Sequence, residues 1–155
     1  MAKIYLNAET IDDFLERLNR INVNTKPAWG KLNATRMLFH LRLLIEVCLG
    51  ERSVSDVSNI FTRTFIRFMA LRVLNWKGFL LRGNITAPDE FTPDAEFDFE
   101  SERDALITCM KHFIQEVQTN PTRKINHPFF GPLTLQDWAL VQGKHTDYHL
   151  HQFGA

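Results

Sequence analysis

The chain has 155 residues, of which 18 are Lys or Arg and 18 are Asp or Glu. This neutral balance removes the general electrostatic case for a nucleic-acid partner or an anionic membrane. The length and the 45% of hydrophobic residues fit one globular domain, taken as residues 1–155. The start of the chain lacks the apolar run of a signal peptide or a membrane span, and Cys48 and Cys109 form no CxxC pair. We therefore expect a soluble protein in the reducing cytoplasm.

Apolar residues at helical spacing predict the first three elements. A helix is expected at about residues 8–21, and a second begins after the N-cap Asn33 and ends at Gly50. A third, rich in phenylalanine and arginine, is expected at about residues 54–74. Its phenylalanines, Phe61, Phe65 and Phe68, should be buried either on the rest of the chain or between two subunits.

The second half of the chain predicts two further helices. Residues 75–99 carry Gly and Pro and are expected to be irregular, followed by a helix at about 101–119. The last helix opens with a capping-box-like sequence at Thr134. Because the connection before residue 101 is far longer than a tight turn needs, we predict an all-α four-helix bundle with a long crossover that contains the extra helix. In this topology the second helix runs parallel to the one at 101 and antiparallel to the last.

Two histidines four residues apart, His145 and His149, lie in the last predicted helix. Residues at this spacing share a helix face, so both imidazoles can reach one metal ion. With six histidines in 155 residues, roughly 0.2 such pairs arise by chance, so a site needs a further ligand. His40 is the best candidate, because an unpartnered imidazole in its apolar helix would be costly to bury. A hydrogen-bonded core histidine is the plainer alternative for His40.

Other polar residues near this pair have more than one interpretation. Gln142 lies one turn before His145 and either holds a metal-bound water or satisfies a backbone group. Tyr148 is a candidate proton donor or an anchor between the helix and a loop. His151 points to another side of the helix and His127 lies towards its opposite end, so neither is expected to bind metal.

Three segments carry recognisable motifs: Pro-Ala-Trp-Gly-Lys-Leu at 27–32 with His-Leu at 40–41, His-Pro-Phe-Phe-Gly-Pro-Leu-Thr at 127–134, and His-Thr-Asp-Tyr-His-Leu-His-Gln-Phe at 145–153. Together they resemble the DinB-like (damage-inducible, YfiT-like) metalloprotein superfamily. The ending resembles a branch without an assigned function. The resemblance spans nearly the whole chain and implies the same bundle, frequent homodimers, and a divalent metal on His40, His145 and His149. Characterised relatives in that superfamily include metal-dependent thiol transferases.

The residues and the resemblance together predict a metal-dependent enzyme. Three neutral imidazoles leave an open position on the metal, where water or a thiol can be activated for hydrolysis or thiol transfer on a small-molecule substrate. Zinc, nickel, iron and manganese all accept imidazole ligands. The alternative is a non-catalytic metal-binding bundle that acts as a structural or partner-binding protein.

Charge is unevenly distributed in spite of the neutral total. Residues 63–82 carry five basic and no acidic side chains, whereas residues 89–104 carry eight acidic side chains and one arginine. The two blocks either neutralise each other or leave the Phe- and Arg-rich helix free for an acidic partner or a membrane surface. Membrane binding is the less expected outcome.

Overall fold

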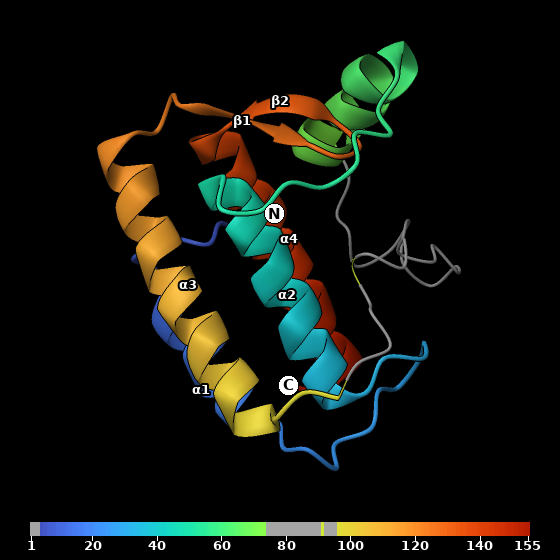
Figure 1. Ribbon diagram of the computed structural model, residues 1–155, viewed down its shortest axis with the longest axis vertical. Coiled ribbons are helices and arrows are strands. Elements are labelled where there is room, and N and C mark those ends of the chain that lie inside the picture. The colour runs from blue at the N-terminus through green and yellow to red at the C-terminus, as the bar shows by residue number, and fades with distance from the viewer. Residues whose placement is uncertain (1–3, 74–90, 92–95) are drawn as a thin grey trace.

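The computed structural model describes residues 4–73, 91 and 96–155, and most of these residues are helical (Figure 1). The α-helices in this part of the chain are α1 (Ile11–Asn19), α2 (Ala34–Leu49), α3 (Phe99–Thr119) and α4 (Leu135–Gln152). Helices α2 and α3 run in the same direction, and α4 runs opposite to both (Figure 1). The mostly helical character is as predicted, whereas the four-helix bundle stays a prediction. The irregular stretch expected at 75–99 lies largely outside the described residues.

Capping residues set the ends of the two helices that carry the histidines. At the start of α2, the Asn33 side chain accepts a hydrogen bond from the backbone N–H of Arg36 at 2.8 Å. Thr134 does the same for the N–H of Asp137 at 3.1 Å, at the start of α4. Each bond satisfies a donor that the helix itself leaves unpaired. Gly50 ends α2 in the left-handed conformation with φ of 79°, as predicted.

A two-stranded antiparallel sheet precedes α4, so the all-α prediction is wrong in this region. Strand β1 (Lys124–His127) pairs with β2 (Gly131–Thr134) (Figure 1). The His127 ring stabilises the turn between them, because its Nδ1 accepts hydrogen bonds from the N–H groups of Phe129 and Phe130 at 3.0 and 3.2 Å. His127 is buried and has a structural role outside the histidine cluster.

The helix predicted at 54–74 begins later than expected. Helical structure starts at Ile60 and includes the π-helical segments η1 (Thr62–Ile66) and η2 (Met69–Val73). The Asn59 side chain accepts a hydrogen bond from the backbone N–H of Thr62 at 3.0 Å. This local cap places the helix start after the polar residues at 55–59, whose side chains favour turns.

The phenylalanines of this helix are exposed. Phe61, Phe65 and Phe68 have 56%, 53% and 58% of their surface accessible. The expectation that they pack on the rest of the chain is therefore wrong, and burial between two subunits stays a prediction.

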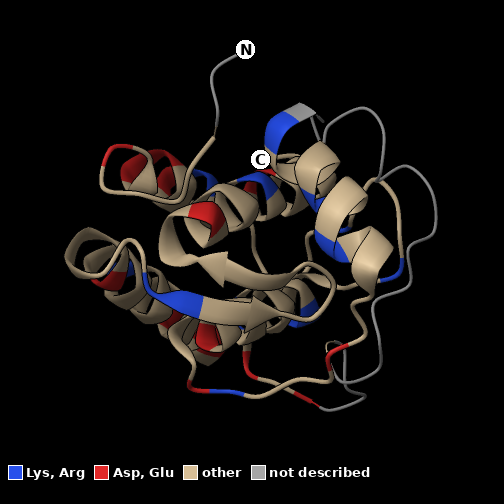
Figure 2. Cartoon of the chain, turned by 90° about the horizontal axis from the view of Figure 1, so that it is seen from above, with Lys and Arg blue, Asp and Glu red and all other residues tan. Residues whose placement is uncertain are grey.

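The two charge blocks do not pair with each other among the described residues. Arg63 forms an ion pair with Asp56 at 3.0 Å, and Arg67 pairs with Asp137 at 3.5 Å. Both acids lie outside the acidic block. Seen from above, the helix at 60–73 carries only basic charge, with acidic residues on other elements (Figure 2).

Ion pairs and close backbone packing hold the helices together around the apolar core. Arg17 of α1 contacts Asp147 of α4 at 3.0 Å, and α2 and α3 are joined by a two-pronged Arg42–Glu102 pair at 2.8 and 3.1 Å. The N-terminal segment lies against Gly143 of α4, where a Cβ would come within 2.5 Å of a backbone oxygen.

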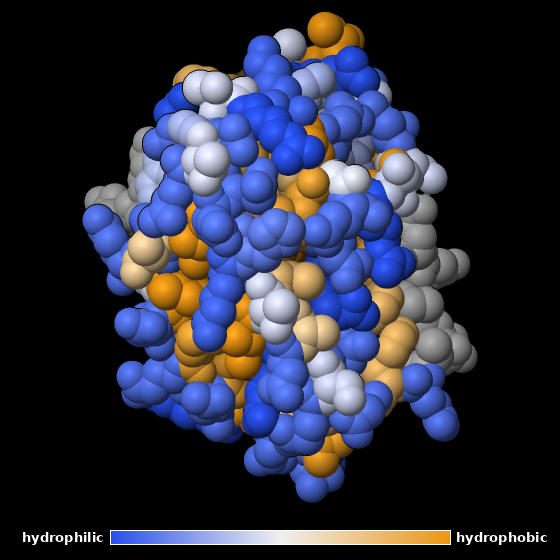
Figure 3. Space-filling model, turned by 60° about the vertical axis from the view of Figure 1, so that its left-hand side comes forward, coloured by the Kyte–Doolittle hydropathy of each residue, from blue (hydrophilic) through white to orange (hydrophobic). Residues whose placement is uncertain are grey.

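The surface on the α1–α3 side is mostly hydrophilic, with hydrophobic residues showing between the hydrophilic ones (Figure 3). No helix in the described ranges is long and apolar enough to cross a membrane.

The burial of His127 can be tested through the pH dependence of stability. Burial lowers its pKa from 6.5 to about 3, because desolvation penalises the imidazolium. Below about pH 6.5 the unfolded chain therefore binds a proton at His127 that the folded chain does not bind. The free energy of unfolding that this difference contributes is fully present above that pH and is lost as the pH falls. We expect about 2 kcal/mol of this contribution to disappear between pH 7.5 and pH 5.

The His127→Asn variant keeps an acceptor for the two turn N–H groups but does not titrate. Its free energy of unfolding in urea should fall by about 2 kcal/mol less than that of the wild type over this interval. If the free energy of unfolding has the same pH dependence in the two proteins, His127 is not a buried neutral histidine with a lowered pKa.

Candidate metal centre

Helices α2 and α4 bring three histidines to one place. His40 lies on α2, and His145 and His149 lie on successive turns of the antiparallel α4. The Nε2 atom of His145 is 3.1 Å from Nε2 of His40 and 3.1 Å from Nε2 of His149. Suitable ligand atoms of all three lie within 4.8 Å of one another. The three residues proposed as ligands from the sequence are thus adjacent in the fold.

Hydrogen bonds on the far side of two rings determine where their protons lie. His40 Nδ1 is 3.2 Å from the backbone oxygen of Phe91, which can only accept, so this nitrogen carries the proton. His149 Nδ1 is 2.8 Å from Gln152 Oε1. The orientation of that amide is fixed because its Nε2 donates to the backbone oxygen of Trp29 at 2.6 Å. Both His40 and His149 therefore direct an unprotonated Nε2 at His145.

Burial keeps the cluster neutral. Desolvation lowers the pKa of His40 to about 4 and that of His149 to about 3. Desolvation also holds the pKa of His145 well below 6.5, and the neighbouring histidines lower it further. The neutral imidazole is the form that binds metal, so the cluster is ready to act as a ligand set at neutral pH.

The donor set fits a divalent cation. A tetrahedral ion with bonds of about 2.0–2.1 Å holds its ligand nitrogens roughly 3.3–3.4 Å apart, close to the two separations of 3.1 Å. An Nε2–H on His145 would have to be shared between two lone pairs, whereas one ion satisfies all three nitrogens. Among the described residues, no Cys, Asp or Glu joins the cluster.

Tyr148 and the loop at 28–30 enclose one side of the cluster. The Trp29 indole N–H donates to the Tyr148 hydroxyl at 2.7 Å, and the Tyr148 ring lies 5.0 Å from that of His149. The structure therefore shows Tyr148 anchoring the helix to the loop, and a role as proton donor stays a prediction. His151 is exposed and lies against Trp29 rather than in the cluster.

Gln142 is buried one turn before His145 on α4. Its Nε2 donates to Cys48 Sγ at 3.3 Å, whereas its Oε1 has no partner among the described residues. The Cys48 thiol donates to the Leu44 backbone oxygen at 2.9 Å, as a core cysteine would. Cys48 is thus engaged away from the cluster.

Two groups that orient the histidines were missed from the sequence. Gln152 lies three residues after His149 on the same helix face, and this spacing could have identified it. The backbone oxygen of Phe91 leaves no signal in the sequence, since every residue carries one.

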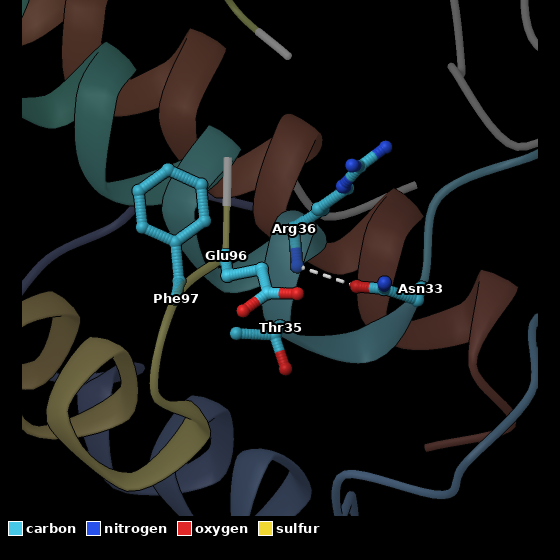
Figure 4. A pocket seen from close by; sticks show the side chains of 5 residues that line it. All are labelled: Asn33, Thr35, Arg36, Glu96 and Phe97. Carbon is cyan, nitrogen blue, oxygen red and sulfur yellow. Dashed lines mark hydrogen bonds between the residues drawn. The ribbon is translucent and has the colours of Figure 1, made fainter. Parts of the chain in front are cut away.

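An open pocket lies at the N-terminal end of α2. It has a volume of about 400 Å³ and is lined by Asn33, Thr35, Arg36, Glu96 and Phe97 (Figure 4). Arg36 precedes His40 by one turn on α2, and Phe97 stacks on Phe39 with ring centres 4.3 Å apart. The pocket is of a size that admits a small molecule.

Comparison with known proteins identifies a family without an assigned activity. Residues 2–155 match the family described as "Protein of unknown function (DUF1569)". No curated protein and no solved structure matched the chain. The resemblance to the DinB-like superfamily is wrong as an assignment, because the matching family is a different one. The chain belongs to the DUF1569 family.

Proposed function

We propose that this protein is a metal-dependent enzyme that binds one divalent cation through His40, His145 and His149 and acts on a small-molecule substrate. The convergence of the Nε2 atoms, two of them held unprotonated, carries the proposal. When bound, the ion supplies Lewis-acid chemistry and lowers the pKa of a water molecule or a thiol at its open position. Zinc, nickel, iron and manganese all suit an imidazole donor set.

Within the part of the chain that the structure describes, the cluster has three neutral ligands, and this number and charge favour a catalytic site over a structural one. Structural zinc sites have four protein ligands, whereas catalytic sites have three and keep one position for water or substrate. Neutral imidazoles also leave the full charge of the cation available to a nucleophile. Hydrolysis and thiol transfer both begin with deprotonation of a nucleophile, so both reaction classes fit this site.

The His145→Ala variant tests the role of the metal. Protein purified without a histidine tag should take up about one equivalent of divalent metal at pH 8 and turn over an ester or a thiol–electrophile pair in a substrate screen. Loss of one ligand should abolish metal retention and turnover, with the melting temperature lowered only modestly, because the apolar core supplies most of the folding free energy. The assay pH matters because metal-free imidazoles can protonate and repel one another in acid.

His151→Ala provides the matched control, since it removes an exposed histidine from the same helix. It should keep metal and activity. A structural metal would behave differently: chelation or His145→Ala would lower the melting temperature sharply, and no substrate would be turned over. Failure of the wild type to bind any of the four metals would contradict the site itself.

A second candidate function, partner binding, rests on the exposed apolar side chains around η1. Phe61 and Phe65 stack with ring centres 5.4 Å apart, and Ile60 beside them is 79% exposed. At roughly 200 Å² per phenylalanine side chain, Phe61, Phe65 and Phe68 together expose about 300 Å². Apolar patches of about 300–600 Å² on a monomer are often functional.

We propose that this patch joins two copies of the chain. Arg63 and Arg67 at its border have their charges compensated by Asp56 and Asp137, so the patch is suited to an apolar surface rather than an anionic one. If two such patches faced each other, with Val57 and Ile60 included, the total area buried would approach the lower end of the range for stable interfaces, which is about 1,200–2,000 Å².

Sedimentation of the Phe65→Glu variant tests this surface. The wild type should sediment as a dimer and the variant as a monomer, because a carboxylate in the apolar contact would be desolvated without a partner. Val23→Glu is the control, since it places the same charge at another exposed apolar site. If the wild type is a monomer and binds anionic vesicles through this patch, the dimer proposal is wrong and the patch is a membrane-binding surface.

A further inference from the structure

Three buried polar atoms within little more than one turn of α4 lack a hydrogen-bond partner among the described residues. They are Gln142 Oε1, His145 Nδ1 and Thr146 Oγ1. Buried polar atoms are almost always paired, and leaving one unpaired costs about 1–3 kcal/mol. Three such atoms on neighbouring turns of one helix therefore call for a partner beyond the described residues, such as a water molecule.

The direction of the Gln142 amide is fixed by its neighbour on α2. Cys48 donates its thiol proton to the Leu44 backbone oxygen at 2.9 Å, so its sulfur acts as an acceptor towards Gln142. The amide NH₂ faces this sulfur at 3.3 Å. Gln142 Oε1 is therefore directed away from Cys48, as an acceptor that needs a donor.

His145 supplies that donor once its Nε2 binds a metal. A metal on Nε2 requires the proton to be on Nδ1, which makes Nδ1–H a buried donor. Residues three and four apart on a helix are neighbours with Cβ atoms about 5–6 Å apart, so Gln142 lies beside both His145 and Thr146. A single water molecule can span such a separation and typically makes about three hydrogen bonds when buried.

We propose that one buried water molecule links His145 Nδ1–H to Gln142 Oε1, with Thr146 Oγ1 as its third partner. Gln142 is thereby the positioning residue for the ligand His145, and this inference rests on the proposed metal site. Each ligand then has its own orienting group: the Phe91 backbone oxygen for His40, Gln152 for His149, and Gln142 through water for His145.

Zinc affinity of Gln142 variants, measured by competition with a chromophoric chelator, tests the inference. Gln142→Leu removes the acceptor at nearly constant volume and should weaken zinc binding by about 10–100-fold. Gln142→Glu keeps an acceptor oxygen and should bind zinc at least as tightly as the wild type. Cys48→Ala removes the other partner of Gln142 and should change the affinity far less than Gln142→Leu.

Nitrogen-15 NMR of histidine-labelled, zinc-loaded protein gives a signal that would not change if Gln142 had a purely structural role. The His145 Nδ1–H signal should be protected from exchange in the wild type and lost in Gln142→Leu, while the corresponding His40 and His149 signals persist. Thr146→Val removes the third water partner with little change of shape and should weaken binding by a smaller factor. It serves as the second variant if Gln142→Leu fails to fold.

Unchanged zinc affinity and an unchanged His145 signal in both Gln142→Leu and Thr146→Val would overturn the water link while leaving the metal site intact. If Gln142→Leu fails to fold, the same result in Thr146→Val alone would overturn it. A wild type without zinc affinity would overturn the proposed function and, with it, this role of Gln142. The two failures are therefore distinguishable.

Discussion

The positions of two protons determine what the histidine cluster can do. The Phe91 backbone oxygen and Gln152 Oε1 can only accept, so they hold protons on the Nδ1 atoms of His40 and His149. Both Nε2 lone pairs then face His145 at 3.1 Å. Without this constraint the rings could satisfy one another by ordinary hydrogen bonds, as core histidines do. With it, the cluster has more acceptors than donors, and a cation is the simplest group that completes it.

The rest of the fold maintains this arrangement. Antiparallel packing of α4 on α2 sets His40 opposite the pair on α4, and Gly143 lets the N-terminal segment lie close against the same helix. Gln152 has two roles, because it orients His149 and also binds the Trp29 backbone at 2.6 Å. The loop at 28–30 is thus tied to the outer face of the cluster. The same Gln152 amide therefore couples the position of the Trp29 backbone to the orientation of His149.

Local and periodic features were predictable from the sequence, and so were the relative directions of α2, α3 and α4, whereas most other tertiary features were not. Asn33 and Thr134 cap their helices as expected, and the 145/149 spacing paired two histidines, because these features depend on helix geometry alone. His40 was added by a different argument, the cost of burying an unpartnered imidazole. The hairpin at 124–134 was missed, since four-residue strands leave too few positions to show alternation. For the exposed Phe61 and Phe65, burial on the rest of the chain or between two subunits was predicted, because periodicity reports an apolar face but not what covers it. The family assignment failed although its ligand residues lie together, because short motifs around histidines do not separate one family from another.

X-ray absorption spectroscopy of the zinc-loaded wild-type protein tests the central claim most directly, since it reports the atoms bound to the metal without reference to any substrate. Three imidazoles and one further oxygen or nitrogen ligand, at about 2.0–2.1 Å, are the result that an open three-histidine site predicts. A sulfur ligand at about 2.3 Å, or a first shell with fewer than three imidazoles, would contradict it.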